Sequence, residues 1–82
     1  MFSEEYQKML HARSVNNRGA LLDSGQCGCF FCLKMFRPEE IRRWLHEETA
    51  LCPYCSTDAV IPESDDYELD DLLLLAMKEY WF

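Results

Sequence analysis

Two CxxC pairs constrain the fold of this chain more than any other feature of its sequence. Cys29 and Cys32 form the first pair, Cys52 and Cys55 form the second, and nineteen residues (33 to 51) separate them. Each pair predicts a tight turn, a knuckle, that aims two sulfur atoms at one point. Paired CxxC motifs at this spacing are typical of a structural zinc site with four thiolate ligands and no open position. We therefore expect one structural Zn²⁺ bound by these four cysteines, although four thiolates also accept iron.

The size of the chain favours a metal-stabilised domain. Its 82 residues predict a single domain, 1–82, and its hydrophobic content of 49% is too high for a disordered tail. A domain this small buries a modest fraction of its surface, so its stability is marginal without an additional crosslink. Thiolate–zinc bonds can supply it, with apparent binding free energies on the order of 10–16 kcal/mol in small zinc peptides. We expect a thin core whose folding is coupled to metal binding.

The sequence indicates a reducing compartment and no membrane segment. Ser3, Glu4 and Glu5 stand where a secretory signal would carry basic and then apolar residues. The longest apolar run, Leu72 to Met77, is far too short to span a bilayer. We therefore expect a cytoplasmic protein whose cysteines are reduced, which favours metal ligation over disulfides.

Charge is distributed unevenly along the chain, whose net charge is −7. Residues 47–82 hold ten acidic residues against the single Lys78, whereas residues 1–46 hold seven basic and five acidic residues. An acidic chain is repelled by phosphate backbones unless its basic residues cluster. The charge balance therefore argues against nucleic acid as the main partner without excluding it.

Local patterns predict about three helices and a few short strands. An N-terminal helix is expected over 3–23, or broken near residue 17, with Ser3 as its N-cap. A second helix is expected over about 38–48, because Ile41, Trp44 and Leu45 fall on one helical face. The remaining expected elements are short strands flanking the first knuckle within 27–36, a strand at 59–61 that Pro62 ends, an acidic turn at 63–66, and a last helix over about 68–80.

Several residues carry an alternative chemistry. Cys27 could replace Cys29 as a ligand, or it could be a small buried residue beside the site. The segment from Cys52 to Cys55, CPYC, is also the tetrapeptide of the glutaredoxin active site, but too few residues follow it for that fold. A thiol redox protein is therefore the least favoured alternative. His11 and His46 lack the neighbouring acid or nucleophile that catalysis requires, so we assign them to structure or surface and predict no catalytic residues.

A basic cluster offers a second function. Arg37, Arg42 and Arg43, with Lys34 nearby, would lie on or beside the predicted helix between the knuckles. That helix could contact phosphate, as zinc-finger helices do. The other interpretation is a solvated face that offsets the acidic C-terminal half. A nucleic-acid-associated regulator is therefore kept as the alternative function.

The C-terminal segment holds more apolar residues than one helical face requires. Leu72 to Leu75 and Tyr80 to Phe82 would leave apolar side chains exposed if only one stripe packed inward. Contiguous exposed apolar residues mark interaction sites. Two interpretations stay open: a protein partner or a second copy covers the surplus, or the two preceding helices do.

The motifs together resemble a family of small bacterial cytoplasmic proteins that are zinc-finger-like. The resemblance rests on CGCFFCL at 27–33, PEEI at 38–41 with Trp44, TALCPYC at 49–55, DAVI at 58–61 and the closing YWF at 80–82. It covers most of the chain, and it implies a zinc site and an intracellular setting but no activity. Ser56 stands where such proteins usually carry glycine.

These observations favour an α+β, zinc-ribbon-like or treble-clef-like domain with two CxxC knuckles, a short hairpin and about three helices. The expected function is a non-enzymatic zinc-binding module that mediates protein association through its apolar C-terminal helix, either with itself or with another chain.

Overall fold

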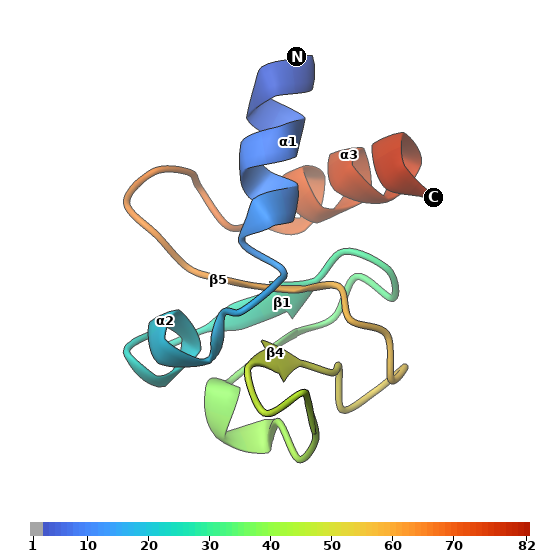
Figure 1. Ribbon diagram of the computed structural model, residues 1–82. Helices are drawn as coiled ribbons and strands as arrows, with labels where there is room; N and C mark the ends of the chain where they lie inside the picture. Colours follow the sequence, from blue (N-terminus) through green and yellow to red (C-terminus); the bar gives the residue numbers. More distant parts are fainter. Residues whose placement is uncertain (1–2) are drawn as a thin grey trace.

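The computed structural model describes residues 3–82, which form three helices and two small antiparallel sheets (Figure 1). The predicted α+β class with two knuckles, a short hairpin and about three helices is confirmed. The helices are α1 (Glu4–Ala12), α2 (Arg18–Leu22) and α3 (Asp71–Trp81), and η1 (Pro38–Glu40) is one turn of 3₁₀ helix. The strands are β1 (Cys27–Cys29), β2 (Met35–Phe36), β3 (Trp44–Leu45), β4 (Thr49–Ala50) and β5 (Val60–Pro62).

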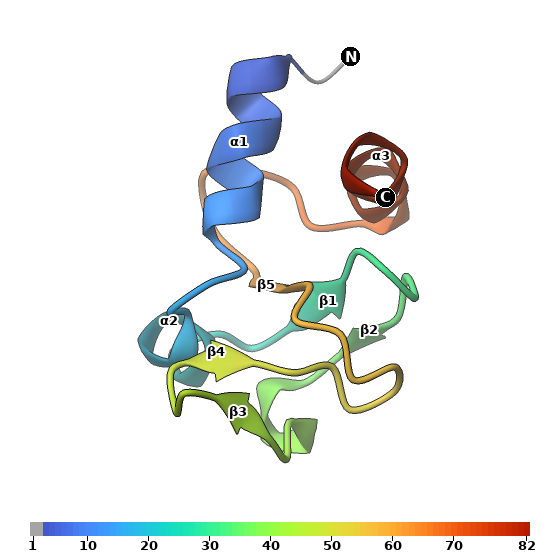
Figure 2. The same cartoon turned by 45° about the vertical axis from the view of Figure 1, so that its right-hand side comes forward.

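The larger sheet separates two layers of the molecule. Its strand order is β2-β1-β5, with Gly28 of β1 opposite Met35 on one side and Ile61 on the other. Figures 1 and 2 show α1 and α3 above this sheet, and α2 with the β3–β4 hairpin below it. The buried core lies on both sides of β1 and β5, whose residues are all buried.

The N-terminal helix is broken near residue 17, as one of the two sequence interpretations predicts. Ser3 caps α1 by accepting a hydrogen bond from the Tyr6 N–H, and α1 ends at Ala12. The buried Asn17 side chain then takes over the hydrogen bonding: its Nδ2 donates to the carbonyls of Arg13 and Val60, and its Oδ1 accepts from the Ala50 N–H. A continuous helix would leave these buried backbone groups without a partner.

The predicted helix over 38–48 is wrong. Only Pro38–Glu40 is helical, as the 3₁₀ turn η1, and the rest forms the β3–β4 hairpin, in which Trp44 pairs with Ala50. His46 and Glu47 both have positive φ, 52° and 65°, at the tip of this hairpin. Tertiary contacts override the local helical pattern here, because Asn17 and Asn16 bind the backbone and side chain of β4 (Thr49–Ala50).

The last helix is α3, slightly shorter at its start than the predicted 68–80. Asp70 is its N-cap and accepts a hydrogen bond from the Leu73 N–H. Leu73, Leu74 and Met77 are buried and pack α3 against the sheet and α1. The strand predicted at 59–61 is observed as β5, with Pro62 as its last residue.

Candidate metal centre

The four predicted cysteines come together at one point beside the larger sheet. The Sγ atoms of Cys29, Cys32, Cys52 and Cys55 all lie within 4.8 Å of one another. Cys29 and Cys55 are 3.6 Å apart at sulfur, as are Cys32 and Cys52, and none of the four is in a disulfide. A tetrahedron of four sulfurs with Zn–S bonds of about 2.3 Å has edges of about 3.8 Å. The cluster therefore fits a four-thiolate metal ion.

The two knuckles have the same backbone geometry. In the first, the N–H of Phe31 donates to the Cys29 Sγ at 3.4 Å, and the N–H of Leu33 donates to the Cys29 carbonyl at 2.9 Å. In the second, Tyr54 donates to the Cys52 Sγ at 3.4 Å, and Ser56 donates to the Cys52 carbonyl at 2.8 Å.

A left-handed residue ends each knuckle. Leu33 and Ser56, the residues directly after each CxxC pair, both have a φ of 67°. Each first cysteine also donates its N–H to a residue five positions on: Cys29 to Lys34, and Cys52 to Thr57. The repeated geometry shows that each pair forms the same sulfur-directing turn, and that the site is assembled by facing the two turns.

Burial and hydrogen bonding set the electrostatics of the four thiols. Burial raises the pKa of Cys29, partly opposed by the N–H groups of Cys32 and Phe31, and burial raises the pKa of Cys52 to about 11. Burial also acts to raise the pKa of Cys55, but hydrogen bonds from Thr57 and from the neighbouring thiols bring it down to about 7. A bound cation must displace the protons of the buried thiols, so metal affinity rises with pH.

Cys27 lies outside the cluster. It is fully buried in β1, and its Sγ donates to the Phe36 carbonyl at 3.5 Å. Burial, with Glu40 next in importance, raises the pKa of Cys27 to about 12. The structure therefore places Cys27 as a small buried residue beside the site.

The two histidines are also separate from the cluster. The His11 ring packs against Trp81, with centroids 4.2 Å apart, and against Phe30. His46 is exposed at the tip of the β3–β4 hairpin.

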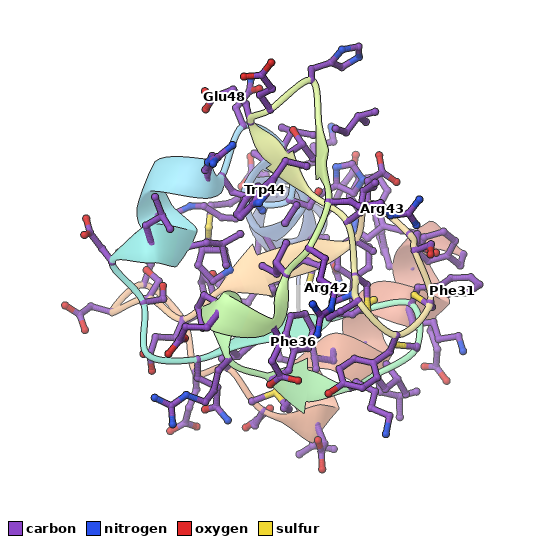
Figure 3. All side chains as sticks on the ribbon, turned by 90° about the horizontal axis from the view of Figure 1, so that it is seen from below. Phe31, Phe36, Arg42, Arg43, Trp44 and Glu48 are labelled. Carbon is purple, nitrogen blue, oxygen red and sulfur yellow. The ribbon has the colours of Figure 1, made fainter. Side chains whose placement is uncertain are left out.

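The basic cluster does not lie on a helix. Arg37 pairs with Glu39 at 3.4 Å, and Arg43 donates to the Ser56 hydroxyl at 2.9 Å. Figure 3 shows Arg42, Arg43 and Trp44 on the face below the larger sheet, around the chain that leads into the β3–β4 hairpin. The segment therefore lacks the helix on which the nucleic-acid interpretation relied.

Sequence reasoning missed the residues that complete the knuckles. Leu33, Ser56 and Thr57 are ordinary residue types, and neither left-handed position carries the glycine that would have marked it. The only available signal was the position of Leu33 and Ser56 directly after the two CxxC pairs.

No family model, curated protein or solved structure matches the chain. None of the helices within residues 3–82 is both long enough and apolar enough to cross a membrane.

Proposed function

We propose that this chain is a non-enzymatic protein-association module whose fold is held by one structural zinc ion. The observation that carries the proposal is the outward face of α3, which leaves large apolar side chains exposed on a domain built around a four-cysteine cluster. Leu72 is 73% exposed, Leu75 is 40% exposed and Phe82 is 63% exposed.

The donor set supports structural zinc. Four thiolates complete a tetrahedral zinc shell and leave no position for a substrate. Hydrogen bonds from the Phe31 and Tyr54 N–H groups to sulfur orient the ligands, as outer-shell partners of metal sites do. Reduced cysteines are maintained in the cytosol, so we place the protein there.

The surroundings of the cluster support a non-enzymatic role. The cluster is the single group of potential metal ligands among residues 3–82, and neither histidine is part of it. A metal-assisted reaction needs an open coordination position and a group that can move a proton beside it. A closed four-thiolate shell offers neither.

Solvent exposure around α3 supports a role in association. Leu73, Leu74 and Met77 fill the core, so α1 and the larger sheet cover one side of α3. Leu72 and Leu75 fall on the opposite side of the helix and remain exposed. Burying an exposed leucine contributes about 1.5–3 kcal/mol, so a partner that covers this face gains substantially.

Site-specific photo-crosslinking in the source cells tests this proposal. Truncating the chain would remove the core residues of α3, so the design leaves the helix in place. A photoreactive phenylalanine analogue replaces Leu75 in one variant and Leu22, 69% exposed on α2, in the control. We expect a crosslinked species of higher mass from position 75, its loss when Leu72→Ser is added, and none from position 22.

Equal crosslinking from both positions, or none from position 75, would contradict association through α3. A product of twice the chain mass would identify a second copy as the partner, and any other mass would identify a different protein.

A further inference from the structure

The exposed face of α3 has the spacing of a helix-pairing seam. Leu72, Leu75, Glu79 and Phe82 follow one another at i, i+3, i+7 and i+10, which places all four on one side of the helix. We call these four residues the α3 stripe. Three of them are apolar, and Glu79 stands between Leu75 and Phe82.

The apolar surface continues from the α3 stripe onto the first knuckle. Phe82 packs edge-on against Phe31, with ring centroids 4.9 Å apart, and Phe31 is itself 38% exposed. Lys78 Nζ lies 5.4 Å from the centre of the Phe31 ring. The only basic side chain of α3 is therefore directed at the knuckle, not at the acidic residues of its own helix.

The charge around the stripe is strongly acidic. Residues 63–82 hold seven acidic residues and one lysine. Within residues 3–82, Glu68, Asp71 and Glu79 make no ion pair, whereas Glu4 pairs with Lys8 at 3.1 Å and Asp66 pairs with Arg13.

Glu79 has no explanation in the stability of α3 itself. It lies in the last turn, where the helix dipole disfavours an acid, and its neighbours one turn earlier are Leu75 and Ala76. Asp71, by contrast, is in the first turn, where the dipole favours it. An unpaired acid within an apolar seam selects a partner with a basic residue at the matching position.

We propose that the α3 stripe binds a basic amphipathic helix of another protein. Apolar side chains of that helix would cover Leu72, Leu75 and Phe82, and its lysines or arginines would meet Asp71 and Glu79. This inference rests on the proposed function and adds the chemistry of the partner.

Charge disfavours the other occupants. Two copies paired through this face would bring two sets of unpaired acids together, on chains whose net charge is already −7 each. Nucleic acid and anionic membranes are repelled in the same way.

Binding of synthetic helices to the zinc-loaded full chain tests the inference. The probes are a labelled amphipathic leucine–lysine helix, a scrambled peptide of the same composition, and a leucine–glutamate helix of the same pattern, measured by fluorescence anisotropy. We expect the amphipathic leucine–lysine helix to bind at least about tenfold more tightly than the other two, a difference of about 1.4 kcal/mol. Leu72→Ser with Leu75→Ser, and separately Glu79→Lys, should each weaken it about tenfold, whereas Leu22→Ser should have no effect.

The possible contrary results are distinct. The inference of a basic partner would be overturned if Glu79→Lys left the affinity for the leucine–lysine helix unchanged and the leucine–glutamate helix also bound through the α3 stripe. Association through α3 would then still stand. Unchanged binding of every probe after Leu72→Ser with Leu75→Ser would overturn the α3 stripe and remove the main support for the proposed function. A dimer that dissociates on Leu75→Ser would replace the basic helix by a second copy.

Discussion

Five residues other than glycine adopt positive φ, and four of them lie in the two knuckles and the hairpin tip. They are Leu33, Ser56, His46 and Glu47, with Asn16 between α1 and α2 as the fifth, and no glycine among residues 3–82 has positive φ. A left-handed conformation costs roughly 1–2 kcal/mol for a residue with a side chain. At Leu33 and Ser56 the conformation directs the sulfurs, so metal binding can offset that cost. At the hairpin tip no ligand offsets it.

The hairpin tip can therefore be stabilised without touching the site. The Glu48 N–H donates to the Leu45 carbonyl at 3.1 Å, which closes a turn around His46 and Glu47, and turns with two positive φ values favour Asn-Gly. We expect His46→Asn with Glu47→Gly to raise the free energy of unfolding by about 1 kcal/mol. Thermal unfolding of the zinc-loaded protein measures the change.

Glu48→Gly is the matched control, because Glu48 is in the same loop but is not left-handed. It should lower the melting temperature. Equal stabilisation by the two changes would show that loop flexibility, not relief of the backbone strain, is responsible.

The clustering of the four cysteines could be predicted from sequence, because thiolate–metal chemistry imposes a spacing that few other functions share. The residues that shape the knuckles could not. Leu33 has no sequence mark of a left-handed position, and the hydrogen bonds of Thr57 to Cys55 depend on the turn that they stabilise.

At the scale of elements, the segment between the knuckles shows that a local hydrophobic pattern can predict the wrong secondary structure. Ile41, Trp44 and Leu45 fit a helical face, and yet Trp44 belongs to strand β3. The guanidinium carbon of Arg18 lies over the Trp44 ring, 4.8 Å from the ring centre. Contacts with α2 and Asn17, distant in sequence, decide the outcome. The strands around the first knuckle and α3 were predictable, because turn chemistry and a long apolar helix identify them locally.

Packing of α3 on β1 gives a prediction at this scale. A Cβ at Gly28 would lie 2.9 Å from Leu74 Cδ1 and 3.1 Å from Met35 Sδ, whereas a Cβ at Gly19 in α2 would meet nothing within 4 Å. We expect Gly28→Ala to lower the free energy of unfolding by about 1–3 kcal/mol through overpacking. Gly19→Ala, the matched control, should raise it by about 0.5–1 kcal/mol, since alanine favours a helix.

Thermal unfolding at a fixed zinc concentration measures both variants. In a Leu74→Ala background, Gly28→Ala should lower the free energy of unfolding by less than it does in the wild type, because the smaller side chain makes room for the added methyl group. If the changes in the free energy of unfolding of the two single variants simply add up in the double variant, Leu74 is not in tight contact with β1 at Gly28.

At the scale of the whole molecule, the four-cysteine cluster and the exposed helix are physically connected. Phe30 and Phe31 lie inside the first knuckle, and Phe82 packs against both, with ring centroids 5.8 Å and 4.9 Å away. A Cβ at Gly28, the residue before Cys29, would lie 2.9 Å from Leu74 Cδ1, so α3 packs closely on the strand that leads into the first knuckle. A metal that orders the first knuckle therefore also supports the position of α3, so the surface proposed for association should require the metal.

Native mass spectrometry with and without a chelator, paired with far-ultraviolet circular dichroism, tests the central claim most directly. We predict one zinc ion per chain for the wild type and for Cys27→Ala, whose thiol lies outside the cluster, and none for Cys52→Ser. Removal of zinc should abolish most of the helical signal, because a small zinc domain folds with its metal. A metal-free protein that keeps its helices, or loss of zinc in Cys27→Ala, would contradict the account.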